Sequence, residues 1–360
     1  MNGKYKAFWI DDDGFVEVID QTKLPFIEET VLLKSADDAI VAIKDMIVRG
    51  AGVIGNIGAL GVYLAVKENQ DLKYIVEKSK EIRESRPTAV NLMWAVDIML
   101  EGILNANADV NLLELAKNEA IKICDEDAER SLLISKYGCD IFGDIMKKKN
   151  KTSINVLTHC NAGWLAIVDE GSALAPIYEA KRRGIDIHVY VDETRPRNQG
   201  ANLTAWELTQ SDINHTVIPD NTGGYLMQQG LVDVCIVGAD RVSANGDVAN
   251  KIGTYLKALA AKDNDIPFYV AIPEGTLDFE IKDGVRDIPI ETRSEDEVKY
   301  IKGLNKQGVV EELLLTPLTS KAVNYGFDIT PARLVTALIT EKGVCKTDEN
   351  SIYKMFKENK

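Results

Sequence analysis

The chain has 360 residues, which predicts two domains at roughly 150 residues per domain. Its 42 Lys and Arg residues against 56 Asp and Glu residues give a formal charge of −14. This balance argues against a nucleic-acid partner or an anionic membrane partner, because both require an exposed basic surface. A hydrophobic content of 45% and a charged content of 27% are typical of globular proteins and exclude disordered, collagen-like and coiled-coil classes.

Targeting signals and disulfides are not expected. The start, MNGKYKAFWIDDDG, has no apolar run followed by a cleavage site, so it does not read as a secretory signal. The most apolar long run, 52–66, is glycine-rich and too short to span a membrane. The five cysteines are scattered, without a CxxC pair and with an odd count: Cys124, Cys139, Cys160, Cys235 and Cys345. They predict reduced thiols in a cytoplasmic protein.

The first 149 residues read as a small β-hairpin or meander followed by a mainly helical domain. Residues 7–20 alternate apolar and polar residues around an Asp-Gly turn, which predicts a hairpin. Ser35 and Asp38 resemble a capping box at the start of a helix. A helix follows from Thr88, after a proline suited to a first turn, to about Leu104. Apolar spacing over 111–146 predicts one or two long amphipathic helices.

From residue 150 to residue 360 we expect a Rossmann-like domain with a doubly wound parallel sheet. Short strands rich in β-branched residues alternate with helical segments, which is typical of α/β proteins. The expected strands are 154–160, 186–193, 215–220, 232–240 and 267–274. A polar run at 147–150 separates the two parts of the chain and predicts the domain boundary.

In such sheets, ligands bind beyond the carboxyl ends of the strands. The residues expected at those ends are one thiol and several carboxylates: Cys160, Asp192 and Glu193, Asp220, Asp240, and Glu274. The sequence therefore predicts that these groups converge on one edge of the sheet, which makes that edge the candidate site.

Two of these residues are the chemical candidates. Polar residues flank Cys160, and the Asn-Ala-Gly that follows could begin a helix whose N-terminus lowers the thiol pKa. Asp240 ends an apolar stretch, so we expect a partly desolvated carboxylate with a raised pKa, suited to a general acid. The alternatives are a buried apolar cysteine for the first and a helix cap or a salt bridge to Arg241 for the second.

Residues 50–55 match the GxGxxG pattern of dinucleotide sites. A dinucleotide site is disfavoured, because a helical pattern precedes the glycines where a strand is required. A glycine-rich turn entering a helix, together with Arg49, suits a phosphate instead. Close helix packing through the glycines is the structural alternative. Arg86 is a further candidate for a phosphate ligand, with a solvated surface charge as the alternative. Lys251 could pair either with a phosphate or with Asp240.

No metal or other cofactor is expected. The three histidines, His159, His188 and His215, show no metal-binding spacing, and His188 lies inside an expected strand.

Several long motifs resemble the methylthioribose-1-phosphate isomerase family, within the wider group that includes regulatory subunits of translation initiation factor 2B. The resemblance covers essentially the whole chain. Its main segments are DQTKLPF (20–26), VRGAGVIG (48–55), SRPTAVNLMWAVD (85–97), LTHCNAG (157–163), VYVDETRPRNQGANLTAWEL (189–208), VGADRVSANGDVANKIGTY (237–255), IPIETR (288–293) and FDITPARLVTALITEKGV (327–344).

The resemblance implies a metal-free aldose–ketose isomerase of methionine salvage. Such an enzyme converts S-methyl-5-thioribose 1-phosphate to S-methyl-5-thioribulose 1-phosphate, and the resemblance implies Cys160 as the base and Asp240 as the acid. A hydride shift is the alternative to an enediol intermediate. The implied phosphate ligands are Arg49, Gly50, Ala51, Arg86, Gln199, Asn250 and Lys251. A homodimer is also implied, with the amino-terminal domain closing over the site.

The chain departs from the family's usual motifs at positions expected near the pocket. Gly52 and Val53 replace Pro-Ala, Trp164 replaces a small residue, and the segments 221–224 and 272–278 also differ. These departures leave open an isomerase of 5-deoxyribose 1-phosphate or ribose 1,5-bisphosphate. A non-catalytic subunit like those of initiation factor 2B is a further alternative, which the presence of both Cys160 and Asp240 disfavours.

Overall fold

The structure is a computed structural model that describes residues 6–86 and 89–358. The chain packs into two compact units, and each is described by itself. The first unit comprises Met1–Leu24, Glu28–Leu132 and Ala162–Gly171, and the second comprises Pro25–Ile27, Leu133–Asn161 and Ser172–Lys360.

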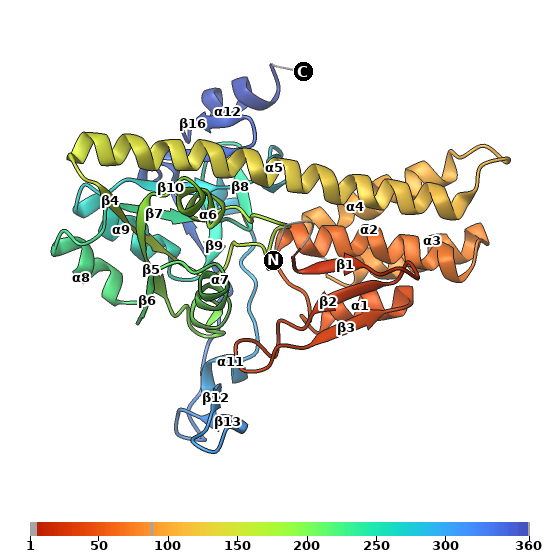
Figure 1. Cartoon of the computed structure of the whole chain (residues 1–360), viewed down its shortest axis with the longest axis horizontal. Coiled ribbons are helices and arrows are strands. Elements are labelled where there is room, and N and C mark those ends of the chain that lie inside the picture. Colours follow the sequence, from red (N-terminus) through yellow and green to blue (C-terminus); the bar gives the residue numbers. More distant parts are fainter. Residues whose placement is uncertain (1–5, 87–88, 359–360) are drawn as a thin grey trace. The chain divides into compact units, whose positions relative to one another are not determined.

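The first unit begins with a three-stranded antiparallel sheet. It consists of β1 (Phe8–Ile10), β2 (Val16–Ile19) and β3 (Thr30–Leu33), in that order. The predicted hairpin is therefore confirmed and extended to a meander (Figure 1). Gly14 occupies the turn with a φ of +74°, a conformation that glycine adopts without steric cost.

Four helices follow in the first unit: α1 (Ala36–Lys44), α2 (Ala51–Glu68), α3 (Leu72–Glu84) and α4 (Val90–Leu104). The capping box at Ser35 is confirmed, because its Oγ accepts from the Asp38 N–H at 3.1 Å and the Asp38 carboxylate accepts from the Ser35 N–H at 3.0 Å. The predicted start of α4 at Thr88, and the proline before it, lie outside the described residues.

Helix α2 is buried along almost its whole length, from Gly52 to Val66. Its glycines allow close approach, since a Cβ at Gly58 would meet Leu92 of α4 at 2.4 Å. Among the residues that the structure describes, no helix is both long enough and apolar enough to cross a membrane. The apolar run of α2 is therefore the core of a helical layer.

Helix α5 (Leu112–Lys149) is one continuous helix, which selects the single-helix alternative for 111–146 (Figure 1). The polar run predicted as the domain boundary coincides with its carboxyl end. The compact units, however, divide between Leu132 and Leu133, inside the helix. Two domains meeting at residues 149 and 150 therefore stay a prediction.

The second unit is built on a seven-stranded sheet with the order β16-β15-β10-β7-β4-β5-β6. Its strands are β4 (Ser153–Thr158), β5 (Asp186–Asp192), β6 (His215–Ile218), β7 (Val234–Val237), β10 (Phe268–Ala271), β15 (Ala337–Thr340) and β16 (Gly343–Cys345). All neighbours are parallel except β16, which pairs antiparallel with β15. Counted from β6, the six parallel strands follow the Rossmann order 3-2-1-4-5-6, so the predicted doubly wound fold is confirmed.

Helices connect the strands of this sheet. They are α6 (Ala175–Arg182), a π-turn at Gly200–Thr204 leading into α7 (Ala205–Gln210), α8 (Thr222–Gln228), α9 (Thr254–Asp263) and α12 (Glu349–Phe356). The core between sheet and helices includes Leu157, Cys235, Phe268 and Leu338, all nearly inaccessible to solvent. Burial raises the pKa of the Cys139 and Cys345 thiols to about 11, as expected for apolar core cysteines.

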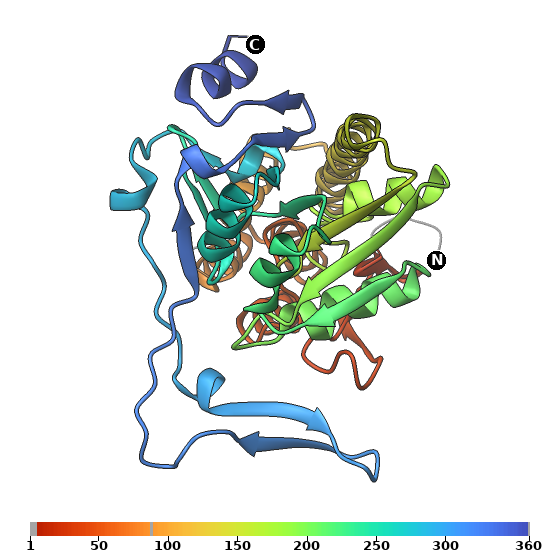
Figure 2. The ribbon, with the colours of Figure 1, turned by 90° about the vertical axis from the view of Figure 1, so that its left-hand side faces the viewer.

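A second, four-stranded sheet with the order β11-β8-β9-β14 adjoins the strand ends. Its strands are β8 (Arg241–Ser243), β9 (Val248–Lys251), β11 (Leu277–Asp278) and β14 (Phe327–Thr330). The short helices α10 (Gly284–Asp287) and α11 (Asp296–Lys299) lead to a hairpin of β12 (Tyr300–Leu304) and β13 (Val310–Leu314). Figure 2 shows this hairpin extending away from the seven-stranded sheet of its own unit.

Asp233 fixes the end of α5 to the start of β7. Its carboxylate accepts from Lys149 at 2.9 Å, from Lys151 at 2.6 Å and from the Asn155 N–H at 3.0 Å. Burial raises the pKa of Asp233, but these hydrogen bonds outweigh it and hold the pKa below its usual value. The ionised carboxylate therefore stabilises this junction.

Asp233→Asn should lower the free energy of unfolding by about 2 kcal/mol at pH 7, measured by urea denaturation. Because the native pKa is lowered, the difference should be present above pH 4 and should vanish as the pH falls through the native pKa. Asp144→Asn, which removes an exposed pair with Lys147, is the control and should change stability by less than about 0.5 kcal/mol. Equal effects for the two variants would contradict this account.

Candidate active site

The candidate site lies where the strand order of the large sheet reverses. The chain runs outward from β4 through β5 to β6, then returns to place β7 on the other side of β4. Cys160 comes two residues after β4, and Asp240 comes three residues after β7. Ligands of doubly wound folds bind at this switch point, so the topology brings the two chemical candidates to the expected place.

Cys160 is buried and held in an unusual backbone conformation. Its φ is +65°, a region that non-glycine residues rarely adopt. The Thr194 hydroxyl accepts from the Cys160 N–H at 2.9 Å and donates to the Asp192 carbonyl at 2.9 Å. The sulfur lies 3.5 Å from Oε1 of Gln199. The surrounding loop thus fixes where the thiol points, which suits a reacting group.

A buried polar network fixes the chain just beyond Cys160. The Thr204 hydroxyl donates to the Cys160 carbonyl at 2.6 Å, and the Asn161 amide donates to Glu207 at 2.6 Å. The other oxygen of Glu207 accepts from the Tyr178 hydroxyl at 2.7 Å. Because every partner is buried, these hydrogen bonds hold the backbone at Cys160 and Asn161 in a single arrangement.

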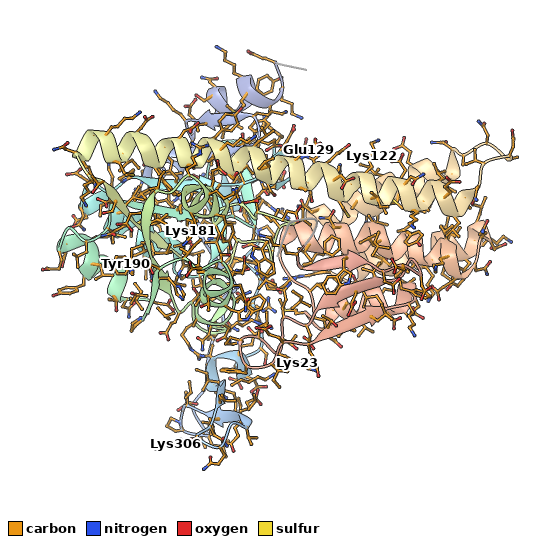
Figure 3. All side chains as sticks on the ribbon, viewed as in Figure 1. Lys23, Lys122, Glu129, Lys181, Tyr190 and Lys306 are labelled. Atoms are coloured by element: carbon orange, nitrogen blue, oxygen red, sulfur yellow. The ribbon has the colours of Figure 1, made fainter. Side chains whose placement is uncertain are left out.

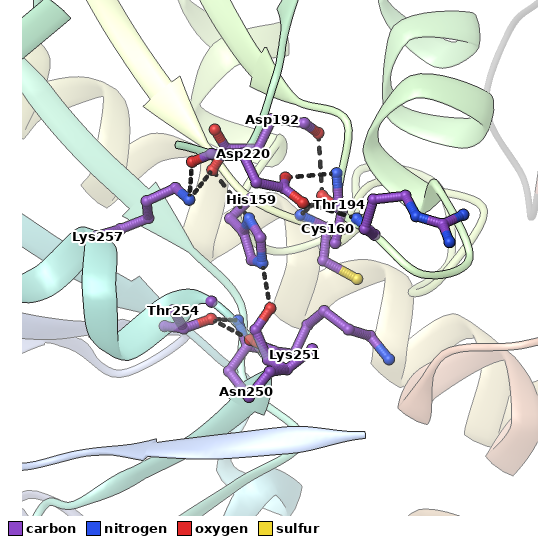
Figure 4. A network of polar contacts seen from close by, with 12 residues as sticks. His159, Cys160, Asp192, Thr194, Asp220, Asn250, Lys251, Thr254 and Lys257 are labelled. Atoms are coloured by element: carbon purple, nitrogen blue, oxygen red, sulfur yellow. Dashed lines mark hydrogen bonds and ion pairs between the residues drawn. The ribbon is translucent and has the colours of Figure 1, made fainter. Parts of the chain in front are cut away.

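His159 links three elements of the second unit. Its Nδ1 lies 2.9 Å from Asp192 at the end of β5, and its Nε2 lies 2.9 Å from the carbonyl of Ile252, between β9 and α9 (Figure 4). A carbonyl only accepts, so Nε2 carries a proton that it donates to Ile252. The residue next to Cys160 is thereby tied to the segment that carries Asn250 and Lys251.

Lys257 supplies a positive charge to this network. Its Nζ lies 3.3 Å from Asp192 and donates to the carbonyl of Asp220, and the whole side chain is buried. Burial raises the pKa of Asp192, while the bond to His159 and the charge of Lys257 act in the opposite direction. A buried carboxylate of this kind requires its ammonium partner, Lys257, to remain in place.

Among the residues that the structure describes, His159, Asp192 and Asp220 form one group whose possible metal-ligand atoms lie within 4.8 Å of one another. Their donors are already engaged. Both ring nitrogens of His159 are used, and the two oxygens of Asp220 accept from the backbone N–H groups of Thr194 and Arg195 at 2.7 and 2.8 Å. A metal ion would have to displace these hydrogen bonds and the ammonium of Lys257, so the donor set does not suit a resident metal.

Of the predicted phosphate ligands, three lie in the second unit near Cys160. Asn250 and Lys251 end β9, both largely buried, and Gln199 is the residue beside the sulfur. Asn250 donates to the Thr254 hydroxyl at 3.0 Å. Figure 4 shows the Lys251 side chain and the Cys160 sulfur extending to the same side of His159. The Gln199 amide therefore contacts the thiol, and the Lys251 side chain extends to the same side of His159 as the sulfur.

The other predicted phosphate ligands belong to the first unit. Arg49 and Ala51 are half-buried, and Arg86 is half-buried at the end of α3. Gly50 has a φ of +92°, and a Cβ there would lie 2.4 Å from Ala166. Gly50 and Gly52 thus pack closely against the loop 162–171, whereas Gly55 packs against Asn91 of α4, as the structural alternative predicted.

Two expectations about the site are wrong in detail. The side chain of Asp240 is exposed, because β7 ends at Val237 and Asp240 lies in the loop before β8. The burial expected of this carboxylate is therefore absent. No helix begins directly after Cys160 either, since α6 starts at Ala175. The helical segment next to the sulfur is the one that follows Gln199.

Comparison with known proteins decides the family. Residues 38–347 match the Initiation factor 2 subunit family. The chain belongs to this family. Among its curated members, the chain is 62% identical over 361 residues to a methylthioribose-1-phosphate isomerase of Sulfurimonas denitrificans, covering 99% of this chain and 100% of that one. It is 52% identical to the isomerase of Desulfatibacillum aliphaticivorans, covering 99% and 98%. The resemblance inferred from the motifs is thus confirmed.

Solved structures of the family agree with the fold. The 5-methylthioribose 1-phosphate isomerase of Pyrococcus horikoshii OT3 matches with a TM-score of 0.86 and 35% identity, over 98% of this chain and 96% of that one. The translation initiation factor eIF-2B subunit delta from A. fulgidus matches with a TM-score of 0.83 and 37% identity, over 97% and 98%. The family therefore includes proteins named as enzymes and proteins named as initiation factor subunits.

Sequence reasoning missed the residues that support Cys160. No pattern in the helical segment 254–263 indicates that Lys257 is buried, although it lies buried against Asp192. His159 drew attention only as a possible metal ligand. The sequence places His159 directly before Cys160 at a strand end, and Asp192 at the end of the next strand. These two positions could have predicted the contact between them.

Lys257→Met should lower the free energy of unfolding by about 3 kcal/mol, because Asp192 would remain buried without its ammonium partner. Lys262→Met, on the exposed side of the same helix, should change it by less than about 0.5 kcal/mol. Thermal and urea denaturation measure both variants. A Lys257→Met variant as stable as the control would show that the buried charges do not depend on this lysine.

Proposed function

We propose that this protein is an aldose–ketose isomerase that converts S-methyl-5-thioribose 1-phosphate to S-methyl-5-thioribulose 1-phosphate in methionine salvage. The observation that carries the proposal is a buried, rigidly held thiol at the switch point, in a chain 62% identical to a protein named for this activity. The reaction needs no redox cofactor, because a hydrogen only moves from C2 to C1.

Cys160 acts as the base and Asp240 as the acid in this proposal. The phosphate on C1 blocks the anomeric centre, so the ring must open before a carbonyl can form at C2. The Cys160 thiolate removes the C2 proton, and the C1–O4 bond breaks as the ring oxygen takes a proton from Asp240. The resulting enol takes the proton back from Cys160 at C1, while the C2 hydroxyl returns its proton to Asp240 and becomes the ketone.

The side chains around Cys160 support these roles. The Gln199 amide can present its oxygen to a thiol or its NH2 group to a thiolate, so it can serve both protonation states. Asp240 is exposed, so its carboxyl group is accessible to a sugar bound at the switch point. A hydride shift from C2 to C1 remains the alternative route.

The residues proposed to bind the phosphate are Asn250, Lys251 and Gln199 of the second unit and the motif residues Arg49, Gly50, Ala51 and Arg86 of the first, as the family resemblance implies. The loop 162–171, which starts two residues after Cys160, packs within the first unit against Gly50, and its Ala166 carbonyl accepts from the Val53 N–H at 3.0 Å. The chain as a whole carries a charge of −14, so a bound phosphate would need cationic side chains gathered at its own site.

The test is ketose formation by the purified protein. We expect turnover of methylthioribose 1-phosphate with a higher kcat/KM than for 5-deoxyribose 1-phosphate or ribose 1,5-bisphosphate. A preference for either of the other sugars would change the substrate but keep the reaction. No turnover of any of the three would overturn the enzyme proposal in favour of a non-catalytic role. The A. fulgidus relative is named as an initiation factor subunit.

Cys160→Ser should lower kcat by roughly 10³-fold or more, because a hydroxyl is a far poorer base than a thiolate. The matched control is Cys345→Ser, since Cys345 is equally buried, at 8% exposed, but lies in β16 at the edge of the sheet. The control should keep near-normal kcat. Near-normal turnover by Cys160→Ser would refute the role of the thiol.

We also propose a cytoplasmic location and a homodimer. The five cysteines are all unbridged and buried, which suits a reducing compartment. The homodimer comes from the family resemblance, and an exposed apolar surface of the second unit supports it.

A further inference from the structure

The loop 162–171 begins just beyond the thiol and belongs to the first unit, although the chain on both sides of it belongs to the second. Every side chain from Trp164 to Val168 is buried. Gly163 closes a turn within the loop, because its carbonyl accepts from the Ala166 N–H at 2.9 Å. A segment with so many buried contacts opens rarely, so the loop is a packed part of the first unit rather than a mobile connection.

This loop supplies a cap that helix α2 lacks in its own sequence. The N-cap residue is Gly50, and no side chain caps the helix. The Ala166 carbonyl of the loop accepts from the Val53 N–H at 3.0 Å, which satisfies one of the N–H groups that a helix leaves open in its first turn. A Cβ at Gly50 would lie 2.4 Å from Ala166, so the two backbones are in close contact. The segment that follows the thiol is thus joined to the turn proposed to bind the phosphate.

Gln21 holds the peptide next to this cap. Its Nε2 donates to the carbonyl of Leu165 at 2.8 Å, and its backbone N–H donates to the carbonyl of Ile47 at 2.9 Å. Gln21 is buried, whereas Lys23, two residues later, is exposed on the segment between β2 and β3 (Figure 3). The carbonyls of two successive loop residues are therefore fixed, one by Gln21 and the next by helix α2.

The amide oxygen of Gln21 argues against a role in stability alone. Oε1 is buried, and no hydrogen-bond donor among the described residues reaches it. A buried acceptor without a donor keeps its full desolvation cost, so an apolar side chain of the same shape would pack at least as favourably. An apolar side chain cannot, however, donate to the Leu165 carbonyl. The motif DQTKLPF (20–26) thus contains a buried amide whose one side-chain hydrogen bond holds this loop.

From these contacts we infer that Gln21 is a positioning residue of the isomerase, which acts on Cys160 through the loop 162–171. Cys160 has a φ of +65°, and such a conformation persists only where the surrounding chain restrains it. Within the second unit, the restraints are the hydrogen bonds of Thr194 and Thr204. Gln21 restrains the segment that follows. This role rests on the proposed function, because the position of the thiol matters to catalysis only if Cys160 reacts.

The test compares Gln21→Met with Tyr63→Phe in the full chain. Methionine keeps the length of the glutamine side chain and removes its donor. Tyr63 is the matched control, because its buried hydroxyl donates to the carbonyl of Gly14 at the same 2.8 Å, within the first unit but away from the loop 162–171. We expect both variants to fold and to lower the urea midpoint by a similar amount, since each loses one buried hydrogen bond to a backbone carbonyl.

Only Gln21→Met should change the kinetics. Phosphate contacts are made in the ground state and the transition state alike, and the Ala166 cap on α2 remains, so KM should stay within about threefold of the wild-type value. The position of the thiol matters in the transition state, so kcat should fall by about tenfold or more. Tyr63→Phe should keep the wild-type kcat. Equal kcat values for the two variants, or a Gln21→Met effect confined to KM, would overturn the positioning role.

Labelling of Cys160 by iodoacetamide gives a readout that does not need turnover. Cys345, also 8% exposed, serves as the reference thiol in the same sample, and mass spectrometry separates the two. Gln21→Met should raise the labelling rate of Cys160 by about fivefold or more and leave that of Cys345 unchanged, because only the chain next to Cys160 loosens. A parallel rise at both cysteines, or a variant that does not fold, would show a role in stability and contradict the inference.

Amide hydrogen exchange of the wild-type protein tests the loop without a variant. The Val53 N–H should exchange at the same rate as the N–H groups of Ala166 and Ile167, because the cap and the loop open together. A much faster exchange at Val53 would show that the loop does not cap the helix, and the role of Gln21 would fall with it. A wild-type protein without turnover would overturn the proposed function itself, whereas an active wild type with an unaffected Gln21→Met variant would overturn the role of Gln21 alone.

Discussion

The pair of hydrogen bonds made by His159 is the interaction on which the site depends. One joins the end of β4 to Asp192 at the end of β5, and the other joins it to Ile252, beyond β9. A Cβ at Gly253 would approach the imidazole to about 3.0 Å, so a glycine with a φ of +105° is needed there. The position of Cys160 and the position of Lys251 are therefore set by one side chain.

This arrangement concentrates buried charge in a strongly acidic chain. Lys257 and His159 face Asp192 out of contact with water, where an unpaired charge would cost several kcal/mol. The network thus contributes specificity of position more than stability. Lys251, also buried, lies with its Nζ 5.3 Å from the centre of the Phe327 ring. The −14 net charge belongs to the chain as a whole, while the site buries two lysines, Lys251 and Lys257.

The sequence predicted the fold well where the signal is local. Strand alternation, the cap at Ser35 and the long helix at 112–149 all follow from patterns of a few residues, and the structure confirms them. Cys160 could be found because polar residues follow an apolar strand. Lys257 could not, since its burial arises only when α9 packs on the sheet. Asp240 is exposed, contrary to the prediction, because β7 ends three residues before it. The packing role of Gly50 could not be predicted, because it depends on close contact with Ala166, which is remote in sequence.

A crystal structure with the ketose 1-phosphate product bound tests the central claim most directly, because it locates the reacting carbons relative to the switch point. The account predicts C1 and C2 within hydrogen-bonding reach of the Cys160 sulfur and of Asp240, with the phosphate contacted by Asn250 and Lys251. A product bound away from the ends of β4 and β7, or with Cys160 facing only the phosphate, would contradict it.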